Sequence, residues 1–263
     1  MLASDSKERF SNRVEDYLRY RPGYPPAILS VLNAECGLTP EAVVADIGSG
    51  TGLLAHMFLE NGNLVYAVEP NAAMRGAGEH LLEKYPHFCS VAGSAESTTL
   101  PPASVDFVLV GQAFHWFEPG AARAEFLRVL KAQGWVVVLF NERISEETPF
   151  QREYEMLLRK FGTDYEIVSA RYPRSEQIKS FFQPCAFETK IFANGQALDF
   201  QGLRGRLLSS SYAPAEGHRN HQPMLVELMR LFSAHQKDGR VRFDYRTYMY
   251  YGQLYENSAK AQV

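Results

Sequence analysis

Five short apolar runs alternate with segments of helical periodicity between residues 43 and 140. The runs cover residues 43–47, 64–68, 88–92, 105–110 and 136–140, and helical segments lie at 26–35, 53–60, 72–84 and 121–130. Strands buried on both faces have such continuous apolar sequences, and parallel strands are joined by crossover helices. The alternation therefore predicts an α/β fold with a doubly wound, mostly parallel sheet that is covered by helices on both faces.

Residues 144–263 are less regular than this core. We expect helices at 150–161, 175–182, 199–211 and 222–235, and strands at 187–193 and 241–251. No proline-, glycine- or serine-rich linker separates them from the core, so we predict a single domain over residues 1–263. Its expected parts are an N-terminal segment (1–40), a ligand-binding core (41–143), a helical lid for the substrate (144–240) and a closing strand with its tail (241–263).

Composition and charge exclude several classes of protein. The chain is 46% hydrophobic and has 30 acidic against 27 basic side chains, a net charge of −3. That balance argues against broad binding to a phosphate backbone, which favours a basic surface. No apolar run reaches the roughly 18–20 residues of a membrane span, and the first residues show no secretory signal. We expect a cytoplasmic monomer or homodimer that binds neither nucleic acid nor a membrane.

A glycine loop, Asp46–Gly52 (D-I-G-S-G-T-G), connects the first predicted strand to the helix after it. Glycines let a ligand approach the backbone closely, and the helix N-terminus presents free amide donors. In an open parallel sheet, ligands bind at the carboxyl ends of the strands, where the strand order reverses. A dinucleotide-binding loop would carry its third glycine where Leu53 stands, and Asp46 would repel a pyrophosphate but suit an ammonium group.

This loop resembles the first motif of the class I S-adenosylmethionine-dependent methyltransferases, which is an acidic residue followed by G-x-G-x-G. The resemblance implies a Rossmann-like fold of seven strands with an antiparallel last strand. It also implies S-adenosylmethionine as the cofactor, S-adenosylhomocysteine as the product, and no metal. The residues that would bracket the methionine part of the cofactor are Asp46, Gly48, Ser49, Gly50 and Gly52.

Two further segments match this family. Glu69 ends the second predicted strand about 20 residues after the glycines, a spacing at which a carboxylate accepts hydrogen bonds from two ribose hydroxyls. Pro70 follows it, and Met74 would either cover the adenine or pack within its own helix. After the third strand, the resemblance places contacts with the adenine edge at Ser94, Ala95 and Glu96.

The segment Gln112–Phe117 (Q-A-F-H-W-F) follows the fourth predicted strand. It resembles a subgroup of type 11-like small-molecule enzymes that includes the trans-aconitate methyltransferases. The resemblance implies cofactor contacts at Gln112, Ala113 and Phe114, and substrate contacts at His115 and Trp116. His115 would act either as a general base or as a hydrogen-bonded structural residue.

The N-terminal segment strengthens the resemblance to this subgroup, because residues 17–25 read Y-x-x-x-R-P-x-Y-P. By resemblance the segment folds over the cofactor. Tyr17 would contact the cofactor, and Arg21 would bind its carboxylate in a two-pronged hydrogen bond. The alternative is a solvated cationic arm whose tyrosines pack on the sheet.

Beyond residue 143 the match weakens to the general layout. Arg204 and Arg206 lie in a segment that loosely resembles an acceptor-pocket helix. They would recognise an acidic substrate or form a polar helix face. Tyr248 and Tyr250 share one face of the last predicted strand, and would border the pocket or pack in the core.

Together these motifs predict a methyltransferase that acts on a small molecule, either a carboxylate or another oxygen or nitrogen acceptor. A carboxylate is ionised at neutral pH and needs no base, whereas a phenol or protonated amine needs one, for which His115 is the candidate. Three alternatives stay open: a carbon methyltransferase of quinone or sterol type, a nicotinamide-dependent oxidoreductase, and a protein that binds adenosylmethionine without turnover. The absent G-x-G-x-x-G spacing argues against the oxidoreductase.

Overall fold

The computed structural model describes residues 20–169 and 175–255. Contacts divide the chain into two compact units. Of the described residues, the sheet unit contains 24–140, 175–192 and 247–255, and the helical unit contains 20–23, 141–169 and 193–246. The assignment of residues 1–263 to a single domain stays a prediction.

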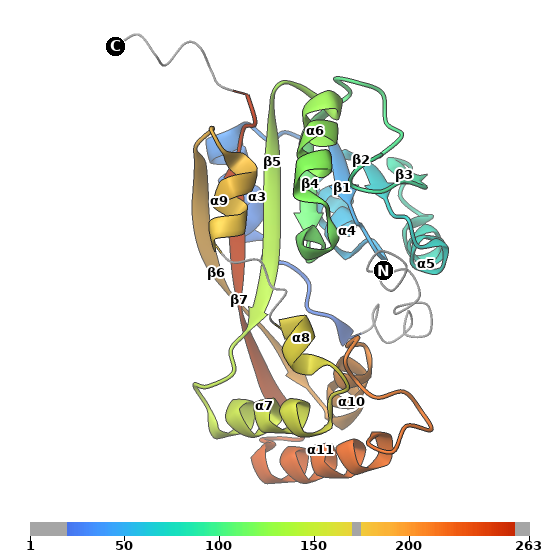
Figure 1. Cartoon of the computed structure of the whole chain (residues 1–263), viewed down its shortest axis with the longest axis vertical. Coiled ribbons are helices and arrows are strands. Elements are labelled where there is room, and N and C mark those ends of the chain that lie inside the picture. The colour runs from blue at the N-terminus through green and yellow to red at the C-terminus, as the bar shows by residue number, and fades with distance from the viewer. Residues whose placement is uncertain (1–19, 170–174, 256–263) are drawn as a thin grey trace. The chain divides into compact units, whose positions relative to one another are not determined.

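A seven-stranded sheet has the strand order β3-β2-β1-β4-β5-β7-β6 (Figure 1). Its strands are β1 Val43–Ile47, β2 Leu64–Val68, β3 Phe88–Val91, β4 Val105–Gly111, β5 Leu130–Arg143, β6 Phe187–Leu198 and β7 Val241–Gly252. The pairs β1–β2, β1–β4, β2–β3 and β4–β5 are parallel. β7 is antiparallel to β5, because Asp244 is hydrogen-bonded to Ile144 and Gln253 to Gln133. The predicted α/β fold, with a mostly parallel sheet and an antiparallel last strand, is confirmed.

Helices cover both faces of the sheet in the sheet unit (Figure 1). They are α3 Ala27–Cys36, α4 Leu53–Glu60, α5 Ala72–Leu82, α6 Pro119–Val129 and α9 Ser175–Phe182, with a short 3-10 helix, η1, at Phe114–Trp116. On one face, Phe126 of α6 and Phe181 of α9 pack in an apolar cluster with strand residues. On the other, Leu32, Phe58 and Leu82 bring α3, α4 and α5 into a second cluster. The central strands are therefore buried from both sides, as their apolar sequences predict.

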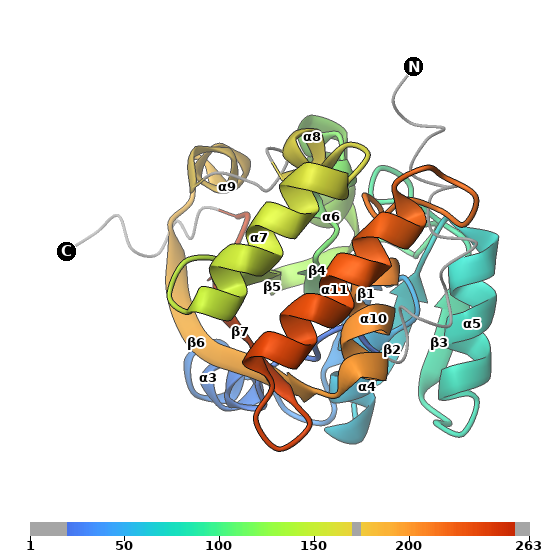
Figure 2. The same cartoon turned by 90° about the horizontal axis from the view of Figure 1, so that it is seen from below.

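The helical unit contains α7 Pro149–Phe161, α8 Tyr165–Ser169, α10 Phe200–Leu208 and α11 His221–His235. α7 and α11 lie side by side (Figure 2) and share an apolar cluster that includes Tyr154, Leu228 and Leu231. α7 begins at a capping box, in which Thr148 and Gln151 each accept a backbone hydrogen bond from the other. Across the described parts of both units, no helix is long and apolar enough to cross a membrane.

The largest differences from what the sequence predicts are in β5, β6 and α8. β5 begins at Leu130 rather than residue 136, and β6 continues to Leu198 rather than residue 193. The added residues of β5 and β6 are mainly polar, alanine or glycine, which lack the apolar continuity of a buried strand. α8 is a helix of 5 residues, too short to show a helical period.

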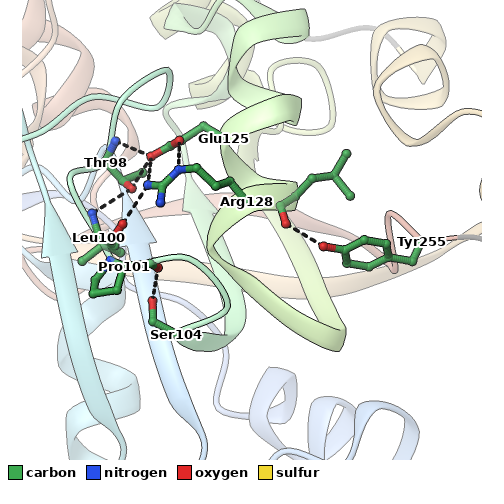
Figure 3. A network of polar contacts seen from close by, with 8 residues as sticks. Thr98, Leu100, Pro101, Ser104, Glu125, Arg128 and Tyr255 are labelled. Atoms are coloured by element: carbon green, nitrogen blue, oxygen red, sulfur yellow. Dashed lines mark hydrogen bonds and ion pairs between the residues drawn. The ribbon is translucent and has the colours of Figure 1, made fainter.

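An ion pair between two side chains of α6 fixes the loop after β3 (Figure 3). Glu125 accepts hydrogen bonds from the backbone N–H of Thr98 at 2.8 Å and from the Thr98 hydroxyl at 2.5 Å. Arg128 donates to both carboxylate oxygens of Glu125 and to the backbone oxygen of Leu100, at 2.7 or 2.8 Å. The hydrogen bonds from Arg128 are the largest cause that lowers the pKa of Glu125 to about 2. The network thereby holds the loop against α6.

We predict that Glu125→Gln lowers the free energy of unfolding at neutral pH by about 1–3 kcal/mol, because the neutral amide leaves Arg128 without its counter-ion. The pKa of the folded carboxyl lies below its ordinary value of 4.5. Its contribution to stability is therefore present above pH 4.5 and is lost as the pH falls toward about 2. Urea unfolding of the wild type and the variant across this range measures the difference.

The matched control for this prediction is Glu147→Gln. Glu147 pairs with Arg246 at the surface, where both side chains are more than half exposed. Removing such a pair costs less than about 1 kcal/mol. A loss in Glu125→Gln no larger than the loss in the control would show that the network contributes nothing beyond a surface ion pair.

Candidate functional site

The glycine loop leaves β1 and turns back beside β2. The backbone N–H of Gly48 donates to the oxygen of Val68 at 2.9 Å, which anchors the loop at the carboxyl end of β2. Gly48 and Gly52 adopt positive φ angles of 69° and 84°. A Cβ at Gly48 would lie 2.7 Å from the Cβ of Ala113, and one at Gly52 would lie 2.5 Å from Cδ1 of Leu82. Both positions therefore require glycine.

Asp46 of β1 is a buried carboxyl group, with 1% of its surface exposed. Its Oδ2 accepts a hydrogen bond from the backbone N–H of Ala55 at 3.0 Å, in the first turn of α4. Its Oδ1 is buried and has no hydrogen-bond partner among the residues that the structure describes. Burial raises the pKa of Asp46 to about 7, against the lowering effect of the Ala55 N–H and with a contribution from the charge of Glu69. A cation or donor at Oδ1 would offset the cost of this burial.

Glu69 follows β2, and its carboxylate lies against the glycine loop. Oε2 accepts a hydrogen bond from the backbone N–H of Gly50 at 2.9 Å, and Oε1 accepts one from Asn71 at 2.8 Å. Burial raises the pKa of Glu69, while these two N–H groups and the charge of Arg75 oppose the rise. Neither Glu69 nor Asp46 forms an ion pair with any described residue. The loop is therefore bordered by two buried acids that form no ion pair with a described residue.

Asn71 and Arg75 hold this corner in place. Asn71 caps α5, because its side-chain oxygen accepts the backbone N–H of Met74 at 3.0 Å. Arg75 donates from Nη1 to the backbone oxygen of Glu69 at 3.0 Å. Asn71 belongs to the segment after Glu69 that resembles the family, and asparagine is a preferred first residue of a helix, but no sequence signal pointed to Arg75. Met74 is buried, and its Cε lies 3.3 Å from where a Cβ at Gly50 would stand.

The loop after β3 forms a tight turn. Ser94 and Ser97 exchange two backbone hydrogen bonds, at 3.0 and 3.3 Å, and Ala95 between them is buried. Oε1 of Glu96 accepts the backbone N–H of Glu118 at 2.9 Å. This bond connects the turn to the segment that follows β4.

The segment after β4 begins with a strained residue. Gln112 has a φ of 58°, a conformation that costs a non-glycine residue about 1–3 kcal/mol. Its backbone N–H donates to the oxygen of Leu139 at 3.0 Å, which fixes the turn against β5. Ala113 and Phe114 are buried, and the ring of Phe114 packs edge-on against Phe181 with ring centroids 5.0 Å apart. Phe114 is therefore part of the core behind the site.

Most of the predicted cofactor residues come together in the sheet unit, at the carboxyl ends of β1, β2, β3 and β4. They are Asp46, Gly48, Ser49, Gly50, Gly52, Glu69, Pro70, Met74, Ser94, Ala95, Glu96, Gln112, Ala113 and Phe114. His115 and Trp116 follow in η1, partly buried, with ring centroids 4.7 Å apart.

Two predicted cofactor residues fall outside that group. Tyr17 lies outside the described residues. Arg21 belongs to the helical unit, where its Nη2 donates to the backbone oxygen of Ser209 at 2.8 Å. Their contacts with a cofactor stay predictions.

The predicted substrate residues outside η1 differ in exposure. Arg204 of α10 is exposed, whereas Arg206, two residues along the same helix, is buried. Tyr248 of β7 is partly buried and stacks on Tyr250, with ring centroids 6.3 Å apart and an angle of 9° between the planes. The roles of Arg204 and Tyr248 stay predictions.

A small hollow of about 180 Å³ opens beside the glycine loop. It is lined by Ser49, Gly50, Gly52, Ala67, Arg75, Gly78, Phe88 and Ser90. Pockets that hold drug-sized ligands measure about 300–1,000 Å³. The hollow is therefore too small to hold a nucleoside cofactor by itself, and neither Asp46 nor Glu69 lines it.

Comparison with known proteins relates the chain to methyltransferases. A family model of a methyltransferase domain matches residues 45–138. An uncharacterized methyltransferase of Mycobacterium bovis is 35% identical over 160 residues, which cover 60% of this chain and 62% of that protein. One of Schizosaccharomyces pombe is 32% identical over 152 residues, 57% of this chain and 59% of that protein. The chain thus spans about three-fifths of the length of these curated relatives.

The fold agrees with this relationship. A solved structure from Anaeromyxobacter dehalogenans, named as a type II methyltransferase, superposes with a TM-score of 0.66 at 20% identity. The match covers 89% of this chain and 98% of that one. Membership of the trans-aconitate subgroup stays a prediction. The glycine loop and these matches identify residues 45–138 as a methyltransferase domain, and the seven-stranded sheet has the fold of that solved structure.

Proposed function

We propose that this chain transfers a methyl group from S-adenosylmethionine to a small-molecule acceptor. The observation that carries the proposal is the pair of buried carboxylates, Asp46 and Glu69, beside the glycine loop. S-adenosylmethionine has an ammonium group, a sulfonium and two ribose hydroxyls, and these groups suit carboxylates that have no cation partner. The net charge of −3 favours a small acceptor over a nucleic acid.

The residues at the loop fit this cofactor. Asp46 would hold the ammonium group, since its buried Oδ1 has no partner among the described residues. Glu69 would accept hydrogen bonds from the ribose hydroxyls, with oxygens that now accept backbone N–H groups. The methionine part would follow the backbone of Gly48–Gly52, where the absence of side chains allows close approach.

The other cofactor contacts are part of the same proposal. Met74 and the turn at residues 94–96 would border the adenine, and residues 112–114 would line the wall near the sulfonium. Because Phe114 is 3% exposed, it would shape that wall from behind rather than stack on the ligand. Tyr17 and Arg21 would cover the cofactor, as the resemblance implies.

The chain's part in the reaction is to align two reactants and to exclude water. When bound, the cofactor supplies a methyl group on a sulfonium, and it leaves as S-adenosylhomocysteine. Holding the acceptor atom in line with the methyl–sulfur bond would supply most of the acceleration. The ring of Trp116 would exclude water and stabilise nearby positive charge. His115 would take the proton of an acceptor whose nucleophilic atom carries one.

We expect calorimetry of the purified chain to show binding of S-adenosylmethionine and S-adenosylhomocysteine. Label from a methyl-labelled cofactor should pass to a component of a metabolite extract. Glu69→Ala should weaken cofactor binding at least about tenfold, because hydrogen bonds to a charged group contribute about 1.5–3 kcal/mol each. The control is Glu83→Ala, since the side chain of Glu83 is 71% exposed near the far end of α5.

The binding and label-transfer measurements distinguish the proposed function from its alternatives. No binding of either cofactor form contradicts the proposed function. Binding without transfer to any extract component indicates a protein that binds adenosylmethionine without turnover. Equal affinity in Glu69→Ala and Glu83→Ala would remove the ribose role of Glu69.

We predict that Asp46→Asn stabilises the ligand-free chain more at pH 8 than at pH 5. Burial raises the pKa of this carboxyl from 3.8 to about 7, so the folded state favours the protonated form. The stability that this proton confers is present below pH 3.8 and is lost as the pH rises through about 7. The loss is at most about 4 kcal/mol, at roughly 1.4 kcal/mol per pKa unit.

Urea unfolding between pH 4 and pH 8 measures this difference. Asp238→Asn is the control, because Asp238 is exposed and already has a positive φ of 51°, which asparagine tolerates. A difference between Asp46→Asn and wild type that stays constant with pH would mean that Asp46 does not ionise as a buried group. Saturating S-adenosylmethionine should stabilise the wild type more than Asp46→Asn.

We predict that His115→Ala slows transfer to a phenol or amine acceptor at least about 100-fold, the usual contribution of a general base. Transfer to a carboxylate acceptor should fall much less, because a carboxylate has no proton to lose and only a substrate contact is removed. The measurements are kcat for both acceptor classes and the affinity for S-adenosylmethionine. An equal loss with both classes would assign His115 to positioning and not to proton transfer.

A further inference from the structure

The charges of three arginines act on Tyr212 in the helical unit. Burial raises the pKa of Tyr212, but the charges of Arg206 and Arg143, a hydrogen bond with Ser210 and the charge of Arg21 together lower it. A net lowering at a buried phenol requires cations close to its oxygen. The arginines come from different segments: Arg206 from α10, Arg143 from the end of β5, and Arg21 from residues 20–23.

Arg206 is a buried cation with neutral partners. Its surface is 6% exposed. Nε donates to the hydroxyl of Tyr245 at 3.0 Å, and Nη1 donates to the hydroxyl of Ser210 at 3.1 Å. The guanidinium also lies 5.9 Å from the ring centroid of Tyr245. No carboxylate among the described residues forms an ion pair with Arg206.

Arg143 pairs with the carboxylate of Glu155, but one of its nitrogen atoms, Nη1, makes no hydrogen bond with a described residue. Its side chain is 12% exposed. Nη2 donates to Glu155 at 2.5 Å and to the hydroxyl of Tyr165 at 3.0 Å. Nη1 is buried and has no hydrogen-bond partner within the described parts of the chain. The guanidinium lies 5.2 Å from the ring centroid of Tyr154, a residue on which Arg206 also acts through its charge.

The charges of this cluster do not balance. Glu155 pairs with Arg143, but the same carboxylate also binds Arg159 at 3.1 Å. Taking a guanidinium out of water costs several kcal/mol unless a counter-ion compensates for it. Arg206 has no such counter-ion among the described residues, and a negative group beyond them would complete the cluster. Guanidinium groups bind the two oxygens of a carboxylate or phosphate with parallel hydrogen bonds.

We propose that Arg206 and Arg143 form a binding site for a compact oxyanion, a carboxylate or phosphate group carried by the methyl acceptor. Nη1 of Arg143 and the remaining nitrogen of Arg206, Nη2, would donate to its oxygens. The assignment of the anion to the acceptor rests on the proposed function. The binding of an anion to the helical unit does not, so the two can be tested separately.

Calorimetric titration of the full chain with inorganic phosphate, succinate and neutral succinamide, at matched ionic strength, tests the site. We expect saturable binding of phosphate or of succinate, and no binding of succinamide. Phosphate alone would assign the site to a phosphate group, and succinate alone to a carboxylate. Binding of neither anion at concentrations up to about 10 mM, or equal binding of succinamide, overturns the proposal.

Variants locate the site. Arg206→Met removes the charge at similar length and should raise the Kd of the anion at least tenfold, and Arg206→Lys, which keeps a charge without the planar fork, should raise it less. The matched control is Arg242→Met on β7, because Arg242 is 78% exposed and pairs with Asp244; its Kd should equal that of the wild type. Arg204→Met tests the exposed arginine of α10. Loss of anion binding there, with binding kept in Arg206→Met, overturns the assignment.

A second variant and a spectroscopic measurement cover the case in which Arg206→Met does not fold. Tyr245→Phe removes the partner of Nε without changing any charge and should weaken anion binding about threefold. The competing counter-ion is Tyr212 itself, as a tyrosinate. A tyrosinate absorbance band at neutral pH that Tyr212→Phe removes, in a wild type that binds no anion, would show that the cluster neutralises itself and would overturn the proposal.

The two proposals fail in different ways. If S-adenosylmethionine binds and transfers its label but no anion binds, only the anion site is wrong. If an anion binds through Arg206 but S-adenosylmethionine does not bind, only the proposed function is wrong, and the anion is not that of a methyl acceptor.

Discussion

The burial of two carboxyl groups that form no ion pair with a described residue, at the carboxyl ends of β1 and β2, is the constraint on which the rest of the sheet unit depends. Asp46 and Glu69 can be buried there because α4, α5 and the glycine loop begin there and offer backbone N–H groups that no helix turn uses. Glu125 in the same unit is treated differently, because it forms an ion pair with Arg128. The charge of Glu125, which holds the loop after β3 against α6, is balanced by Arg128. Asp46 and Glu69 have no such partner among the described residues, so a bound positive charge would stabilise them.

The sequence could predict this loop because its signals are local. An acidic residue, the glycine spacing and a second acid about 20 residues later depend on residues that are close in the chain, and the structure places Asp46 and Glu69 at neighbouring strand ends. The buried cations could not be predicted in the same way. Arg204 and Arg206 are chemically identical and two residues apart on α10, and only the packing of the helix makes one exposed and the other buried. Glu125 binds a partner 27 residues away, which no local pattern encodes.

The sequence alone predicts too short a β6 for a related reason, because tertiary contacts override local preference in strands. Asn194 and Gly195 form a dipeptide that favours a turn when it is read alone. In the structure, the side chain of Asn194 donates to Asn141 at 3.1 Å and to the backbone oxygen of Gly23 at 2.9 Å. These contacts join β6, β5 and residues 20–23 within the helical unit, and they hold Asn194 in an extended strand.

The two units bury ionisable groups of opposite sign, and under the two proposals this difference decides which ligands each can accept. Asp46 and Glu69 favour a cationic ligand, and Arg206 favours an anionic one. A buried charge without a counter-ion lowers the stability of the ligand-free chain, so a ligand of complementary charge both binds and restores stability. A neutral analogue of the ligand would displace water but would leave the buried charge of the protein unpaired. Its binding would be weaker by the free-energy cost of that unpaired charge. Under the two proposals, selectivity at either unit follows from charges that its described residues leave without a counter-ion, rather than from a close fit of shape.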